Sequence, residues 1–261
     1  MLKKLMQVTM VLVAASALAL AQGQTKTQAP KGKGISKKEA DAMNAVFKAK
    51  TPDETIAAAD SFVTNFADSE YKPQVLEAAA EAAEHKNDSP KAIFYAQKAL
   101  EASPQYIPAL NVIALETAGH TRENDLDKDQ KLAQAEKYAK QVLELLPSET
   151  KPAYVSATDA QWEASKKEDA ALAHVALGLI ATVRKKYADA ATELQTAVDN
   201  ESAPDPTHMI RLADAYNKAG KPDDALTVTN KLLAMPNLPD AYKKFVQQEK
   251  DEAERAKSGK K

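Results

Sequence analysis

The chain has 261 residues, with 35 Lys and Arg against 37 Asp and Glu, and its formal net charge of −2 at pH 7 does not point to nucleic acid as a partner. It contains no cysteine, which excludes disulfides, thiolate metal sites, a lipid-modified cysteine and cysteine nucleophiles. Apolar residues make up 44% of the chain and aromatic residues only 5%, which favours alanine- and leucine-rich helices over aromatic-lined pockets. Because alternating runs of β-branched residues are almost absent, the sequence predicts an all-α fold.

Residues 1–21 have the pattern of a secretory signal peptide. Two lysines precede an apolar run at 5–18, and Ala19-Leu20-Ala21 fits the small-x-small rule for signal peptidase. The sequence therefore predicts export to the periplasm or cell envelope, with a mature N-terminus at Gln22. In the alternative, the segment stays uncleaved and is the chain's only contact with a membrane, although the apolar run is short for a span.

The rest of the chain divides into a linker, a helical domain and a tail. Residues 22–38 are polar and contain Gly, Pro and Lys, so we expect a flexible linker. Residues 39–257 predict a helical repeat domain, and 258–261 a basic tail. The expected parts of the domain are units at 39–72, 73–106, 107–149, 171–204 and 206–239, followed by a capping helix at 240–257.

Helix starts and small residues define these units. Thr51-Pro52 and Ser89-Pro90 each combine a capping residue with a proline in the first turn, and so predict helix starts. Small residues recur at one position of the second helix of each unit, where neighbouring helices approach closely. These markers are Ala58, Ala92, Ala135, Ala190 and Ala225.

Two segments depart from the regular spacing. The third unit is longer than the others, and we place the additional residues in a surface insertion at 120–130. Residues 150–170 do not match a whole repeat, so we expect an elongated or extra helix that leads into the unit at 171–204.

The last two units share a pattern of small and aromatic residues. Leu177-Gly178 and Ala190 are followed 35 residues later by Leu212-Ala213 and Ala225. This period resembles that of the tetratricopeptide repeat (TPR) family, here of an exported bacterial type. The resemblance implies a right-handed superhelical solenoid of antiparallel helix pairs, whose concave face binds peptides or partner helices.

The register of this family also suggests positions for partner binding. Glu77, Glu81 and Glu84 recur on one face of the first helix of the second unit, where a basic peptide could bind. Asp214, Asn217 and Lys218 occupy groove-facing positions of the last unit. The alternative is that such polar residues form only the solvated side of each helix.

The insertion contains part of a calcium-loop pattern. Asp125, Asp127, Asp129 and Glu136 match positions 1, 3, 5 and 12 of such a loop. Position 6, which needs glycine for its turn, is Gln130. We therefore expect a solvated turn in which one aspartate caps the next helix, with no bound metal or other cofactor.

No catalytic motif is present: the sequence lacks a Gly-x-Ser-x-Gly elbow, a phosphate-binding glycine loop and a His-Glu-x-x-His pair. The sequence thus predicts a non-catalytic scaffold that binds a protein or peptide, with the partner and the oligomeric state undetermined. A self-associating structural or assembly factor is one alternative function, and a small-molecule carrier or enzyme is another.

Overall fold

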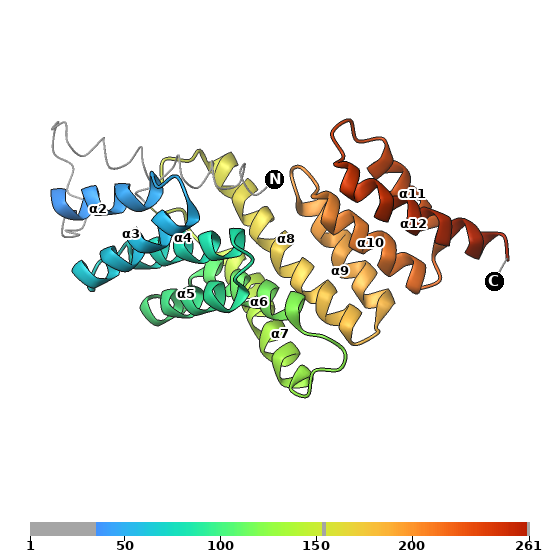
Figure 1. Cartoon of the computed structure of the whole chain (residues 1–261), viewed down its shortest axis with the longest axis horizontal. Coiled ribbons are helices and arrows are strands. Elements are labelled where there is room, and N and C mark those ends of the chain that lie inside the picture. Colours follow the sequence, from blue (N-terminus) through green and yellow to red (C-terminus); the bar gives the residue numbers. More distant parts are fainter. Residues whose placement is uncertain (1–34, 153–154, 260–261) are drawn as a thin grey trace. The chain divides into compact units, whose positions relative to one another are not determined.

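The computed structural model describes residues 35–152 and 155–259 (Figure 1). The predicted signal peptide, most of the predicted linker and the end of the basic tail lie outside these residues. Within the described ranges the secondary structure is helical throughout, which confirms the predicted all-α repeat fold. None of the described helices has the length and apolarity that a membrane span requires.

The helices follow one another with short connections. In chain order they are α2 (Lys37–Phe47), α3 (Pro52–Asn65), α4 (Lys72–His85), α5 (Ser89–Ala102), α6 (Ile107–His120), α7 (Lys128–Leu145), the 3-10 turn η1 (Leu146–Ser148), α8 (Asp159–Val183), α9 (Tyr187–Asn200), α10 (Pro206–Lys218), α11 (Pro222–Leu233) and α12 (Asp240–Lys257). They form two compact units. Of the described residues, the first unit contains those up to Ile113 and those between Ser148 and Glu163, and the second contains those between Ala114 and Pro147 and those from Ala164 onward.

In the first unit, α2 to α5 pack in sequence order. Helix α3 begins with the capping box predicted at Thr51, whose side chain accepts from the Glu54 amide while the Glu54 carboxylate accepts from the Thr51 amide. Its buried stripe consists of Ile56, Ala59 and Phe62. The predicted marker Ala58 is only half-buried, because the stripe of α3 lies in a different register from those of the later second helices.

In the second unit, α9 to α12 pack in sequence order, and α12 also contacts α10. The markers Ala190 and Ala225 are fully buried, as their role at close helix contacts requires. Helix α12 covers this core with Val246, which packs in the same cluster as Leu212 and Leu232. Only two of its residues are buried, as in the polar terminal helix that a solenoid needs.

Helix α8 corrects the expected division of the chain at residue 170. It is one continuous helix of 25 residues. The charged stretch from Ser165 to Asp169 lies within it and contains neither Pro nor Gly, so nothing in the sequence stops the helix there. Within the predicted region 150–170, the described residues before Asp159 are not helical. The structure therefore has one elongated helix that continues into the unit at 171–204, and not a separate extra helix.

Candidate partner-binding surfaces

Helix α4 presents the three predicted glutamates on one face. Its other faces are fixed by a run of buried apolar residues, namely Val75, Leu76, Ala79, Ala80, Ala82 and Ala83. This leaves Glu77, Glu81 and Glu84 partly exposed. The hydroxyl of Tyr106, the residue before α6, donates to Oε2 of Glu77. The sequence therefore placed these carboxylates together correctly, but it gave no sign that a tyrosine holds one of them.

The electrostatic environment of Glu81 differs from that of an ordinary surface carboxylate. Burial raises its pKa to about 7, because the ionised form loses hydration. No cation forms an ion pair with Glu81 in the described part of the chain. A cationic group of a partner would stabilise the ionised carboxylate of Glu81, which has lost part of its hydration.

The three predicted residues of α10 also share one region, but all three already have partners within the chain. Asp214 pairs with Lys218 at 2.8 Å between Oδ2 and Nζ. The Asn217 amide donates to the backbone oxygen and to Oε2 of Glu249 on α12, both at 2.9 Å. Asn217 therefore attaches the terminal helix, and this contact competes with its predicted role in binding a partner.

Charges around this contact perturb two ionisable groups. Burial raises the pKa of Glu249, and the nearby carboxylates of Asp214 and Glu252 raise it further, against the hydrogen bond from Asn217. For Lys218, burial acts to lower the pKa, but the hydrogen bond and charge of Asp214 prevail and raise it. This end of α10 and α12 is consequently rich in negative charge.

The calcium-loop residues do not converge. Helix α7 starts at Lys128, and Asp127 lies at its N-cap position but makes no side-chain capping bond, contrary to the expected cap. Lys131 instead pairs with Asp127 at 3.0 Å and with Asp125 at 3.8 Å. Within the described ranges, no group of three or more His, Asp or Glu residues is arranged to hold a metal ion.

The other two residues of the calcium-loop pattern do not join Asp125 and Asp127 in a common cluster. Asp129 is exposed in the first turn of α7. Glu136 forms ion pairs with Lys140 and Arg184, both at 2.6 Å. These two cations hold the pKa of Glu136 below its usual range, so the carboxylate already has its counter-charges.

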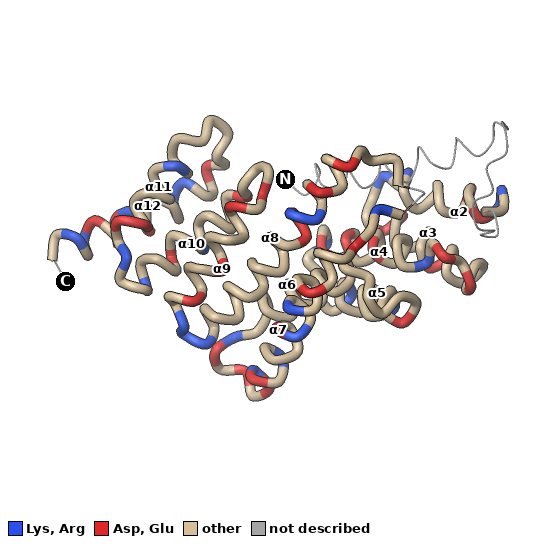
Figure 2. Tube along the Cα trace, turned by 180° about the vertical axis from the view of Figure 1, so that it is seen from behind, with Lys and Arg blue, Asp and Glu red and all other residues tan. Residues whose placement is uncertain are grey.

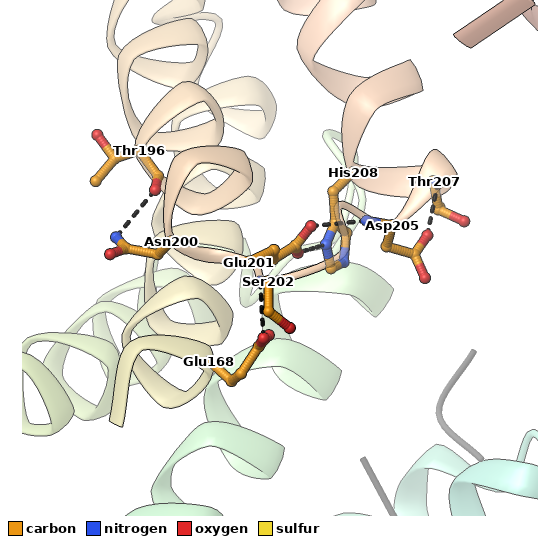
Figure 3. Close-up of polar contacts among 8 residues, drawn as sticks. All are labelled: Glu168, Thr196, Asn200, Glu201, Ser202, Asp205, Thr207 and His208. Atoms are coloured by element: carbon orange, nitrogen blue, oxygen red, sulfur yellow. Dashed lines mark hydrogen bonds and ion pairs between the residues drawn. The ribbon is translucent and has the colours of Figure 1, made fainter. Parts of the chain in front are cut away.

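Polar residues link the end of α9 to the start of α10 in a junction that the sequence patterns did not predict (Figure 3). The buried carboxylate of Glu201 pairs with His208 and accepts from the Asp205 amide at 2.7 Å. Asp205 in turn accepts from the Thr207 amide and caps α10. The sequence signal for this junction was Glu201, which lies seven residues before His208 with a proline-containing turn between them. The junction stiffens the connection between two repeats.

Charges of both signs are interspersed along the helices (Figure 2). The acidic face of α4 and the mixed face of α10 are thus local features of their own units. Each one lies on the first helix of its pair.

Comparison with known proteins agrees with this architecture. No family model and no curated protein sequence matches the chain. Among solved structures, the chain is similar to TTC0263, a thermophilic TPR protein from Thermus thermophilus, with a TM-score of 0.57 and 16% sequence identity, over 81% of this chain and 98% of that one. A computationally designed self-assembling cyclic homooligomer covers 99% of this chain and 94% of its own length at 17% identity, but its TM-score of 0.22 is too low to inform the fold.

The chain therefore has a TPR-like fold. At this identity the similarity concerns the fold alone. Any argument about function has to come from the residues on its first helices.

Proposed function

We propose that this protein is an exported, non-catalytic scaffold that binds a protein or peptide partner in the periplasm or cell envelope. The observation that carries the proposal is the face of α4, where three carboxylates lie on the first helix of a TPR-like pair. Glu81, the desolvated carboxylate among them, forms no ion pair with a cation in the described part of the chain. A basic segment of a partner has the complementary charge.

The binding part of the proposal is tested with a labelled lysine- and arginine-rich peptide and the full mature chain. At pH 8, where Glu81 is mostly ionised, Glu77→Gln, Glu81→Gln and Glu84→Gln together keep side-chain size but remove about three charges. We expect an affinity loss of about tenfold or more, which shrinks at high salt because exposed charges are screened.

The matched control neutralises three exposed acids elsewhere, Asp68→Asn, Asp189→Asn and Asp224→Asn, and changes the net charge equally. It should retain the affinity within about twofold. If both triple variants weakened binding equally, the peptide would be responding to net charge, and α4 would not be the site.

The export part rests on the pattern at residues 1–21 and has its own measurement. We expect mass spectrometry of the native protein to give an N-terminus at Gln22. Chains that begin at Met1 and fractionate with membranes would contradict cleavage and favour an anchored form.

A further inference from the structure

Arg211 is the cation on the face of α10 that lacks a partner. Thr207, Arg211, Asp214 and Lys218 recur at helical spacing and share this face. Thr207 contacts Tyr242, and Asp214 pairs with Lys218. Arg211 is partly buried and makes no ion pair or side-chain hydrogen bond with any described residue.

An unpaired guanidinium in this position destabilises the fold. Removing a charge from water without a counter-charge is costly. Burial lowers the pKa of Arg211, and only the charge of Asp205 opposes this. By contrast, Arg184 in the same unit is neutralised by Glu136 at 2.6 Å. An apolar side chain at 211 would suit the isolated protein better than arginine does.

Helix α12 packs against α10 and carries an exposed aromatic residue, Phe245. The two helices are joined at Thr207–Tyr242, where the hydroxyl oxygens are 3.4 Å apart, and at Asn217–Glu249. Residue 211 lies between these contacts on α10, and Phe245 lies between them on α12. Phe245 is 55% exposed, although it is a large apolar residue.

We propose that Arg211 and Phe245 together bind a partner segment in which one Asp or Glu adjoins an apolar residue. The inference rests on the proposed scaffold function and specifies the chemistry of a partner for the second unit. The guanidinium takes the carboxylate in a charge-assisted pair, and the phenyl ring packs against the apolar side chain. Asp214, Glu249 and Glu252, farther along the same helices, repel additional acids and so select a single acidic residue.

The test uses a labelled twelve-residue peptide that has one Asp between two Leu residues, a counterpart with Asn in place of Asp, and the full mature chain. We expect the Asp peptide to bind at least about tenfold more tightly than the Asn peptide. Arg211→Met should remove this preference, and Phe245→Ala should weaken both peptides about threefold to tenfold.

Matched controls exist for both substitutions. Arg122→Met removes an exposed arginine, and Phe94→Ala removes a phenylalanine that is 51% exposed on another helix. Both should leave peptide affinity unchanged. Arg211→Met should also raise the melting temperature, because it removes an unpaired, partly buried charge. This increase shows that the variant is folded.

Several results would overturn the inference: equal affinity for the Asp and Asn peptides, equal effects of the control variants, or a lower melting temperature in Arg211→Met. Displacement of the Asp peptide by inorganic phosphate at comparable concentration would show a general anion site. If the basic peptide still bound through the α4 glutamates, only this inference would fail. If neither peptide bound, the proposed function would fail with it.

Discussion

Glu81 links the candidate surface on α4 to the stability of the chain. Its pKa is raised from 4.5 to about 7 in the folded state, so between these values the folded chain holds more protons than the unfolded chain. The free energy of unfolding contributed by this group therefore falls as pH rises through that window. A carboxylate whose ionised form weakens the fold is consistent with the proposed role of Glu81 in binding a cationic partner.

We predict that Glu81→Gln stabilises the protein at pH 8 by about 1 to 3 kcal/mol and changes little at pH 4, where both states are protonated. Denaturant unfolding at pH 4, 6 and 8 measures this. The exposed Asp68→Asn serves as the control and should show no such trend. A Glu81→Gln effect independent of pH would mean that packing, and not desolvation of the charge, sets the stability at this position.

Gly178 shows how closely α8 and α9 approach. A Cβ atom at this position would lie 2.6 Å from Cγ of Leu194, which is itself fully buried. Alanine is the better helix former by about 1 kcal/mol, but the collision requires a packed leucine to move. The packing cost should therefore exceed the gain in helix propensity.

We predict that Gly178→Ala lowers the stability by about 0.5 to 2 kcal/mol. Gly119→Ala is the counterpart, because its Cβ would meet nothing closer than Leu179 at 4.0 Å. It should be neutral or raise the stability by up to about 1 kcal/mol. Thermal unfolding of both variants decides the matter, and stabilisation by Gly178→Ala would contradict the close approach.

At the scale of the element, the sequence predicted the helices that carry strong local signals. Thr51-Pro52 started α3 as expected, because the capping box is formed by neighbouring residues. The register of α3 was misjudged at Ala58, since burial depends on which side of the helix meets its neighbours. The continuity of α8 was left open because charged residues neither require nor forbid a helix end.

The buried alanines on the second helices lead to a packing prediction. Ala190 and Ala225 are fully buried, so Ala190→Leu or Ala225→Leu should overpack the helix contact and cost about 1 to 3 kcal/mol. Ala188→Leu is the same substitution at an exposed position of α9 and should be nearly neutral. The measurement is urea unfolding. Equal stability of all three variants would show that the assigned repeat register is wrong.

Lys185, in the connection between α8 and α9, has an unfavourable backbone conformation although its side chain is exposed. Its φ of 58° is the left-handed conformation that glycine tolerates best. Its ammonium group also pairs with Glu123 in the connection before α7. Replacement by alanine would therefore remove an ion pair while it retained the backbone strain.

At the scale of the molecule, the sequence predicted the repeat architecture but only part of the candidate surfaces. Helix periodicity placed the α4 glutamates on one face, because that placement needs only the 3.6-residue period. The link from Asn217 to Glu249 and the isolation of Arg211 depend on contacts between separate helices. One sequence without the fold contains no signal for such contacts.

Contacts between successive helices also predict how far a local disruption spreads. Deleting α12 after Leu238 exposes the side of the core formed by Leu212 and Leu232, which Val246 covers in the complete chain. We predict that amide hydrogen exchange accelerates in α10 and α11 but remains unchanged in α4 and α5, because repeat stability depends on nearest neighbours. Phe245→Ala within the complete chain is the control and should not alter exchange, because that side chain is exposed. Faster exchange throughout the truncated chain would instead identify one cooperative folding unit, so that α12 would stabilise the whole protein and not only the repeat beside it.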